Sequence, residues 1–315
     1  MRWLTWGACF ALAALAVLGV RRAGTGAARP GAGPWTRAFG RLAADRASLA
    51  ALFTLAALAA MAVLAPALTP YDPTAQPDIV ALKNLPPSLA HPLGTDFASR
   101  DVLARMLFGA RITLSVSLLA VLLSTVLGAA YGAVAGFYGG RIDGIMMRAI
   151  DTALAVPRIL VLIAIFAILQ PVPLGALIVL IGVTGWFPTS RLVRAQVLSL
   201  RNQDFAVAAR ALGARDHEIL LRHLLPNALS TVVVAGTLSL GSVIYLEAAL
   251  GYLGIGVRPP TPSWGNILHE GANALGSLWW MALFPGIAIL IATLAVNTLG
   301  DGLRDAFDPR SAELP

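Results

Sequence analysis

The residues that could carry out chemistry are few in this chain and lie far apart. His217 and His223 are six residues apart, a spacing that does not place two imidazoles on one helix face around a shared metal. The single lysine, Lys83, follows a leucine, so the GxxxxGKS/T loop with which many ATPases bind phosphate is missing. The single cysteine, Cys9, excludes an intrachain disulfide and a multi-cysteine metal site. The sequence therefore predicts no catalytic residue, no metal site and no cofactor on this chain.

The remaining ionisable candidates are one acid and the histidines. Glu247 lies near the end of an uncharged run. At membrane depth such a group faces protein or water and tends to be functional, whereas at the membrane surface it is simply solvated. Both interpretations of Glu247 stay open. The four histidines are expected to be solvated or interfacial: His91, His217, His223 and His269.

The elements that position these residues are set by an unusually apolar composition. The 315 residues are 57% hydrophobic and 12% charged, with a mean hydropathy of +0.76, values typical of an integral membrane protein. The net charge of +7 comes from arginines in short runs between long uncharged segments, the pattern that encodes membrane topology. We therefore expect a lipid bilayer as the environment and no nucleic acid as a partner.

The N-terminal 46 residues are expected to form a unit of their own. Residues 3–20 are an uncharged run of 18 residues followed by Arg21 and Arg22, long enough to span a bilayer marginally. We interpret this run as a retained helix with its N-terminus outside, a signal-like segment being the alternative. Residues 21–46 are a basic Gly/Pro/Arg linker expected in the cytoplasm.

Six further helices are predicted from the uncharged runs, which makes the chain an all-α integral membrane protein. Residues 47–110 would hold the first core helix (47–69) and an outer region with a short amphipathic helix near 101–108. Residues 111–310 would hold the rest, with Trp279 and Trp280 as outer interfacial anchors and 311–315 as a tail. The remaining spans are expected at 112–140, 153–170, 174–189, 224–246 and within 271–300, with a cytoplasmic turn at 141–151.

Four glycines recur every four residues in the second core run: Gly128, Gly132, Gly136 and Gly140. In lipid, small residues at this spacing let two helix backbones approach closely. The pattern predicts a helix-packing face, and the alternative is a face that lines a pathway.

The longest polar island is residues 204–227, which lie within an expected cytoplasmic loop at 191–227. Six arginines stand against three acids from 191 to 223, the excess expected of a cytoplasmic loop. Phe205, Ala208, Ala209 and Leu212 recur at i, i+3, i+4 and i+7, so one face of a short helix is apolar, while Asp204 points elsewhere. An apolar patch on a basic background is typical of a helix that binds in a partner's groove.

The second half of the island is predicted to form another helix before the chain re-enters the membrane. Gly213 would end the first helix in a left-handed conformation, Asp216 would cap the second, and Pro226 would stop or kink it. The apolar residues of this second helix are Ile219, Leu220 and Leu224.

Six blocks in order resemble the inner-membrane permease subunits of binding-protein-dependent ABC importers of the dipeptide, oligopeptide and nickel type, in particular their C subunit. The resemblance runs from about residue 47 to 310. The blocks are LTPYDP, HPLGTDFASRDVLARMLFGARITLSV, AGFYGGRIDGIMMRAIDTALAVP, the polar island, EAALGYLGIGVRPPTPSWG and NTLGDGLRDAFDPR.

The resemblance implies a type I importer permease core of six helices in the bacterial inner membrane. It implies a second homologous permease as partner, two ATPase subunits that bind ATP and Mg, and an extracytoplasmic binding protein. It also implies that the island contains an EAA-type signature whose helix docks on an ATPase subunit, with Val207 in place of the signature glutamate. The residues assigned to this coupling loop, at 191–227, are Asp204, Phe205, Val207, Ala208, Ala209, Leu212, Gly213, Ala214, Ile219, Leu225 and Pro226.

The cargo and two other classes of function stay open from the residues alone. Peptide is the cargo that the resemblance favours, and nickel or another small solute is the alternative. An ion-coupled secondary transporter would need carboxylates or histidines at mid-membrane, and an intramembrane enzyme would need a cluster of such groups. The uncharged runs offer neither, and no residue is predicted to touch cargo.

Overall fold

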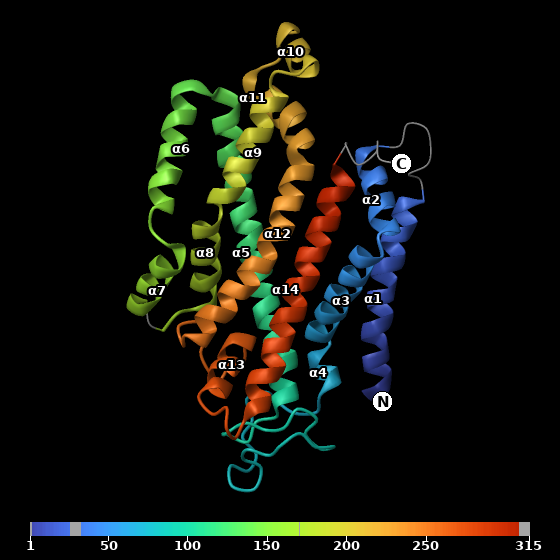
Figure 1. The fold of residues 1–315 in the computed structure, drawn as a ribbon, viewed down its shortest axis with the longest axis vertical. Coiled ribbons are helices and arrows are strands. Elements are labelled where there is room, and N and C mark those ends of the chain that lie inside the picture. Colours follow the sequence, from blue (N-terminus) through green and yellow to red (C-terminus); the bar gives the residue numbers. More distant parts are fainter. Residues whose placement is uncertain (1, 26–32, 170, 309–315) are drawn as a thin grey trace.

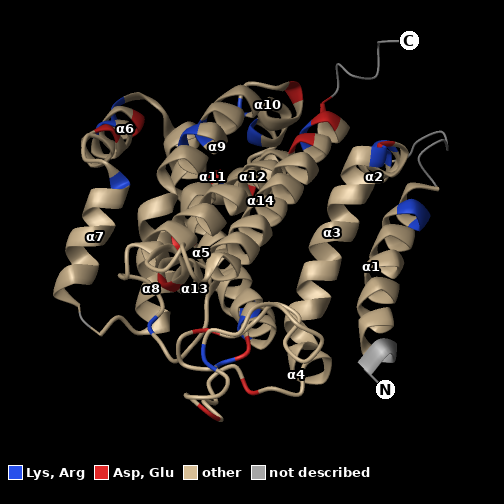
Figure 2. Ribbon diagram, turned by 60° about the horizontal axis from the view of Figure 1, so that its bottom comes forward, with Lys and Arg blue, Asp and Glu red and all other residues tan. Residues whose placement is uncertain are grey.

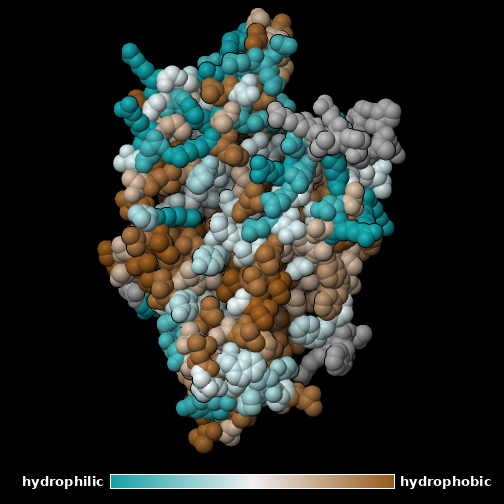
Figure 3. Space-filling model, in the orientation of Figure 1, coloured by the Kyte–Doolittle hydropathy of each residue, from teal (hydrophilic) through white to brown (hydrophobic). Residues whose placement is uncertain are grey.

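The computed structural model describes residues 2–25, 33–169 and 171–308. Its described elements are helices, apart from one isolated bridge between Thr95 and Asp101. The long helices run side by side along the long axis of the molecule (Figure 1). Hydrophobic residues dominate the middle of the surface and hydrophilic residues gather toward its two ends (Figure 3), as expected of a helix bundle surrounded by lipid.

Seven segments of the described chain are candidates to cross a membrane. Five are single helices by length and apolar composition, and two are bent pairs counted as one span each. The bends measure 69° within the first pair, α6–α7, and 42° within the second, α8–α9. The single helices are α1 (Arg2–Gly24), α3 (Arg46–Val63), α5 (Val102–Tyr138), α12 (Leu225–Tyr252) and α14 (Trp279–Phe307); the pairs are α6 (Gly140–Leu154) with α7 (Arg158–Ile168) and α8 (Leu174–Gly185) with α9 (Phe187–Leu200). The prediction of an all-α membrane protein with six core helices and an N-terminal extra helix is confirmed.

The shorter elements lie at the two ends of this bundle. One end carries α10 (Asp204–Ala211), α11 (Asp216–Glu218) and α2 (Pro34–Ala44); the other carries α4 (Ala65–Leu68), the irregular chain from 69 to 101 and α13 (Trp264–Ala272). Arginines concentrate at the α10 end (Figure 2), so the positive-inside rule assigns that end to the cytoplasm. Residues 26–32 of the linker and the 311–315 tail lie outside the described residues.

The N-terminal helices are joined to the last span. The Arg41 guanidinium of α2 donates to the carbonyl oxygens of Ala306 (3.2 Å) and Asp308 (2.8 Å), which satisfies acceptors left open at the end of α14. Trp35 packs edge-on against Phe307, with ring centroids 4.8 Å apart. These contacts fix α2 at the cytoplasmic end of α14.

Asp45 begins the first core helix, α3. Its carboxylate accepts from the backbone N–H groups of Ala47 (3.1 Å) and Ser48 (2.9 Å). The hydrogen bond from the Ser48 hydroxyl is the main reason that the pKa of Asp45 is lowered, and the two backbone bonds lower this pKa further.

Several boundaries differ from the prediction. The linker expected at 21–46 contains the helix α2, the turn expected at 141–151 lies within the helix α6, and the span expected to end at 189 continues through α9. The helix expected near 101–108 is not separate, because α5 begins at Val102, where the Asp101 carboxylate accepts from Ala104 N–H at 2.7 Å, and continues to Tyr138. Arg105 and Arg111 broke the hydropathy pattern, yet Arg105 is buried in an ion-pair network. The short helix α13 was not predicted.

Three of the four glycines hold α5 against α9. An added Cβ at Gly128 would lie 2.8 Å from the Trp186 carbonyl oxygen, at Gly132 2.2 Å from that of Ser190, and at Gly136 2.7 Å from that of Arg194. The helix backbones therefore meet without side chains between them. Gly140 does not belong to this face: it lies after the break at Gly139, has φ +55°, and no atom outside its neighbours lies within 4 Å of its Cβ position.

A buried ion-pair network, here called the outer lock, joins the outer loop, the start of α5 and α13. Asp96 Oδ2 lies 2.6 Å from both Arg100 Nε and Arg105 Nη1. Glu270 of α13 accepts from Arg105 Nη2 at 3.0 Å and from Arg100 Nη2 at 3.2 Å. All four side chains are at most 9% exposed, so each charge depends on the others for compensation.

The side chains of His91, predicted to be solvated or interfacial, and of Trp280, predicted to lie at the membrane interface, are buried beside the outer lock. His91 Nδ1 lies 2.8 Å from Asp101 Oδ2, with His91 7% exposed, so its expected solvated position is wrong. Trp280 donates from Nε1 to the Thr95 carbonyl oxygen at 3.1 Å and is buried, whereas its neighbour Trp279 is exposed. Both are buried because the outer loop folds over the end of the bundle, which hydropathy does not reveal.

Removal of one acid from the outer lock should destabilise the protein strongly. Asp96→Ala leaves Arg100 and Arg105 buried with one carboxylate between them, so we expect a loss of about 3–5 kcal/mol in the free energy of unfolding. Chemical denaturation of the purified protein measures it. Asp78→Ala is the matched control, since the Asp78 carboxylate accepts only backbone N–H groups of Val80 and Ala81 in an exposed turn. Equal stabilities of the two variants would contradict the role of the outer lock.

Candidate functional site

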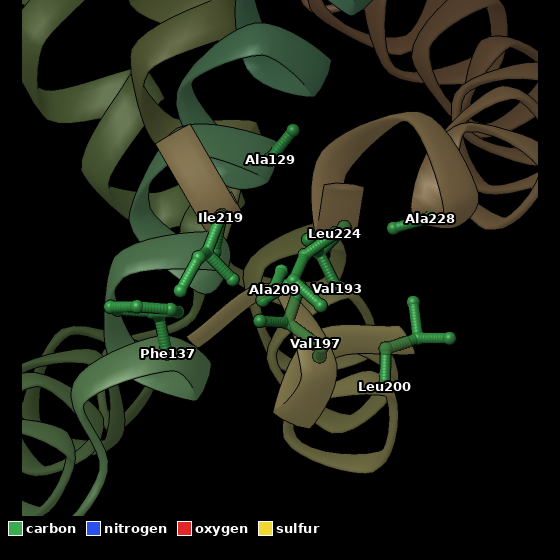
Figure 4. Close-up of a cluster of buried hydrophobic side chains, with 11 residues drawn as sticks. Ala129, Phe137, Val193, Val197, Leu200, Ala209, Ile219, Leu224 and Ala228 are labelled. Atoms are coloured by element: carbon green, nitrogen blue, oxygen red, sulfur yellow. The ribbon is translucent and has the colours of Figure 1, made fainter. Parts of the chain in front are cut away.

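The α10 helix rests on the chain's own core by its smallest side chains. Ala206 is fully buried and Ala209 is 9% exposed. They pack in a hydrophobic cluster, here called the α10 seat, that combines the end of α5, α9 and the segment before α12 (Figure 4). The other buried members of the α10 seat are Ala129, Ala133, Phe137, Val193, Val197, Leu200, Ile219, Leu224 and Ala228.

The opposite side of α10 is apolar and exposed. Phe205 is 37%, Val207 52% and Leu212 88% exposed, and Ala208 is exposed as well. We call these four residues the exposed α10 surface. The predicted apolar face of Phe205, Ala208, Ala209 and Leu212 is therefore wrong in one member, because Ala209 turns inward with Ala206. Alanines three residues apart let α10 approach the core closely, and the larger side chains are left outside.

Gly213 ends α10 in a left-handed conformation, as predicted. Its φ is +86°, and the N–H of Ala214 donates to the Ala209 carbonyl oxygen at 3.1 Å, which satisfies an acceptor at the helix end. Ala214 is half-buried and packs against the α10 seat. Asp204 lies exposed in the first turn of α10, where a carboxylate is favoured by the helix dipole.

The cap predicted for the second helix is displaced. Arg215, not Asp216, occupies the N-cap position, and the Glu218 carboxylate accepts the Arg215 N–H at 3.1 Å. Asp216 is the first helical residue. The sequence pattern placed the helix start at the correct turn. It assigned the capping role to Asp216, whereas the Glu218 carboxylate reaches back across one turn to accept the N–H of the N-cap residue.

Pro226 neither stops nor kinks the helix in the way predicted, since the chain from Asp216 to Tyr252 forms one continuous candidate span. A π-helical segment, η1 (Ile219–Leu224), precedes the proline, and Leu225 N–H donates to the Leu220 carbonyl oxygen. The wider turn gives room to the proline ring, which would clash with the preceding turn of an α-helix. Ile219 is fully buried in the α10 seat, Leu225 is half-buried against it and Pro226 is exposed.

Polar contacts tie the helices under α10 together. Arg201, at the end of α9, donates from Nη1 to the carbonyl oxygens of Phe137 (2.9 Å) and Gly136 (3.2 Å), which caps the end of α5. Arg194 of α9 pairs with Asp143 of α6. Because α10 packs on α5 and α9 in the α10 seat, the Arg194–Asp143 pair links it indirectly to α6 as well.

Glu247 is fully buried within α12, so the interpretation of a solvated interfacial acid is wrong. The hydroxyls of Thr113 and Ser263 are its polar neighbours, although neither carboxylate oxygen forms a geometrically acceptable hydrogen bond within the described part of the chain. Among the described residues, no group of three or more His, Cys, Asp and Glu side chains could hold a metal ion. These residues offer no second site to compare with the exposed α10 surface.

Residues 128–313 match the binding-protein-dependent transport system inner membrane component family, and residues 33–87 match the N-terminal transmembrane domain of oligopeptide transport permease C. The chain belongs to the inner membrane component family. The matched region begins within α5 and includes the α10 seat, the exposed α10 surface and the last two spans. With seven candidate spans, this inner membrane component is a multi-pass plasma-membrane protein.

Relatives of this inner membrane component match it over most of their length. The dipeptide transport system permease protein DppC of Bacillus subtilis is 39% identical over 274 residues, 87% of this chain and 85% of the relative. The oligopeptide transport system permease protein OppC of Bacillus subtilis is 38% identical over 276 residues, 88% and 90% of the two chains. A putative peptide permease protein of Brucella suis is 40% identical over 281 residues, 89% and 92% of the two chains.

Proposed function

We propose that this chain is the pathway-forming permease subunit of an ATP-driven importer of dipeptides or oligopeptides. It would work with a second homologous permease, two ATPase subunits that bind ATP and Mg, and an extracytoplasmic binding protein. The similarity to dipeptide and oligopeptide permeases over more than four-fifths of the chain supports the peptide cargo.

The exposed α10 surface is the main support for a role of this chain in coupling ATP hydrolysis to transport. Leu212, the residue that follows α10, is 88% exposed, and α10 lies at the cytoplasmic end of the molecule (Figure 1). Exposure of a large apolar side chain to water is unfavourable. A helix that is held by alanines on one side and presents large apolar side chains on the other fits a groove in a partner. The ATPase subunit is the partner that we infer for it.

The α10 seat supplies the mechanical step in this proposal. When the ATPase subunits close on ATP, α10 would move with them, and its packing on α9, η1 and the end of α5 would transmit the movement. The six core helices would then rock against those of the second permease, which switches the pathway between the two faces of the membrane.

Val207 limits which contacts the exposed α10 surface can form. Its 52% exposed side chain has no charge, so it cannot supply an ion pair to the ATPase subunit. We therefore infer that shape and apolar contacts dominate the docking, with Asp204 and Arg210 as exposed charged groups on the same helix.

The test is reconstitution in lipid vesicles together with a homologous second permease, two ATPase subunits and a binding protein from the same organism. We expect co-purification of two ATPase subunits and a second permease, and ATP hydrolysis that rises when a peptide-loaded binding protein is added. Peptide uptake by this chain alone, driven by a proton gradient without ATP, would contradict the proposal.

A further inference from the structure

A groove opens between α9, α12 and α14 in the cytoplasmic half of the bundle. Its volume is about 760 Å³, within the range of roughly 300–1,000 Å³ typical of small-molecule sites. Polar and charged side chains line it: Gln196 of α9, Asn227, Ser230 and Thr231 of α12, and Arg304 and Asp308 at the end of α14. Small and aliphatic residues, among them Ala195 and Ala235, form the surfaces between them.

Three of the four polar groups of this groove, the side chains of Gln196, Ser230 and Thr231, lack the intrahelical partners that other hydroxyls of α12 have. Thr237, Ser239 and Ser242 each donate to a carbonyl oxygen three or four residues earlier, at 2.7–2.9 Å. Among the described residues, no such bond involves the Ser230 or Thr231 hydroxyl or the Gln196 amide, although none of the three is fully buried. Hydrogen-bonding groups left open toward hydrocarbon are costly, so this face is built for a polar occupant.

The chemistry of the lining fits a peptide backbone. Every residue of a peptide other than proline carries one N–H donor and one carbonyl acceptor, whatever its side chain. Amide and hydroxyl side chains supply both donors and acceptors, so Gln196, Ser230 and Thr231 can bond to either group. The Asn227 amide nitrogen already donates to the His223 carbonyl oxygen at 2.6 Å, which leaves its oxygen as an acceptor.

We propose that this groove forms the cytoplasmic part of the cargo pathway, in which Gln196, Asn227, Ser230 and Thr231 hydrogen-bond to the backbone of the passing peptide. The assignment rests on the proposed import of peptides. It accounts for tolerance of different peptide side chains, since the four groups bond only to the peptide backbone. Lipid and the second permease are the competing occupants.

Cysteine labelling of the assembled complex separates these occupants. Cys9 is the only cysteine of this chain, so Cys9→Ser gives a permease without thiols, and labelling is read on the band of this subunit. Thr231→Cys in this background is compared with Val126→Cys, an exposed apolar position on α5. With a charged, membrane-impermeant thiol reagent added from the cytoplasmic side, we expect labelling at least about tenfold faster at position 231, because a thiolate forms in water and not in lipid.

Labelling of Thr231→Cys as slow as that of Val126→Cys would overturn the proposal in favour of lipid. A disulfide cross-link from Thr231→Cys to the second permease, formed in both the ATP-free and the ATP-bound complex, would overturn it in favour of a permanent interface. Slower labelling during turnover with trialanine, the binding protein and ATP would support the pathway.

Uptake of trialanine by reconstituted complexes tests the hydrogen bonds. Thr231→Val removes the hydroxyl at constant shape, and we expect the KM for loaded binding protein or the half-saturating trialanine concentration to rise about two- to tenfold, the loss of one hydrogen bond. Thr237→Val is the control, because the Thr237 hydroxyl donates to Val233 within its own helix. Equal values for the two variants would contradict the role of Thr231.

The two proposals fail in different ways. Absence of ATP-dependent peptide uptake by the wild-type complex would contradict the proposed function, while fast labelling of Thr231→Cys would still identify a water-filled groove. Normal ATP-dependent peptide uptake by the wild-type complex, together with a Thr231→Cys variant that does not react with the thiol reagent, would contradict only the assignment of the groove to the pathway.

Discussion

Leu212→Asp should abolish the association of this permease with the ATPase subunits proposed as its partners, while leaving its own fold intact. The side chain is 88% exposed and makes no contribution to the α10 seat, so an aspartate there is solvated in the free chain. In a docked complex the same carboxylate would be buried in an apolar groove without a partner. We expect at least a tenfold loss of co-purified ATPase and of peptide-dependent ATP hydrolysis.

Val80→Asp is the matched control for this experiment. Val80 is 93% exposed but lies in the loop at the outer end, away from any cytoplasmic subunit. The variant should retain its ATPase subunits and an unchanged melting temperature. If Leu212→Asp also retains them, the exposed α10 surface is not the docking site.

Ala209→Arg, which would be a natural choice from the sequence, tests a different property. Ala209 lies inward against the α10 seat and is 9% exposed, so an arginine would push α10 off its support. Loss of uptake in that variant would report on transmission through the chain rather than on contact with the ATPase.

Gly132→Leu should destabilise the core more than any other single glycine substitution on the α5 face. The Cβ alone would lie 2.2 Å from the Ser190 carbonyl oxygen, so α5 and α9 must separate before any further atom is accommodated. Overpacking typically costs about 1–3 kcal/mol when side chains can give way. Here backbone opposes backbone, and we expect a loss at the upper end of that range, seen as a lower melting temperature.

Gly144→Leu makes the same chemical change on α6, where no atom lies within 4 Å of the Cβ position. Leucine also has the higher helix propensity, so this variant should be as stable as the wild type or slightly more stable. Equal melting temperatures of Gly132→Leu and Gly144→Leu would rule out the close contact between α5 and α9.

The spans were predictable because hydrocarbon imposes a simple rule on sequence. Every backbone polar group must be satisfied internally, so uncharged runs of about 20 residues become helices. The rule fails where charge is buried in protein. Arg105 is fully buried in the outer lock, so α5 begins at Val102, nearly three turns before residue 112, where the hydropathy pattern places the start of the span.

The sequence predicted where α10 lies in the chain, but not which side of α10 packs on the rest of the protein. Apolar spacing located α10, and Gly213 located its end, because both depend on local geometry alone. The inward turn of Ala206 and Ala209 depends on Phe137, Val193 and Val197, which belong to other helices whose packing the local pattern does not reveal. Periodicity identifies an apolar face but does not distinguish one that packs on the chain itself from one that is left for a partner.

The groove residues carried the weakest signal in the sequence. Ser230 and Thr231 look like the other hydroxyl residues of α12, and only the hydrogen bonds formed by Thr237, Ser239 and Ser242 set them apart. Gln196 is on another helix, and its place beside them follows from the packing of α9 on α12.

The outer lock gives the two ends of the molecule different sensitivities to ionic strength. Its acids and arginines are at most 9% exposed, so dissolved ions screen them little. At the cytoplasmic end, Arg191 and Asp151 form an ion pair whose side chains are 47% and 61% exposed. High salt should therefore weaken this pair between α9 and α6, leaving the less exposed Arg194–Asp143 pair to join the two helices, while the outer loop, the start of α5 and α13 stay joined.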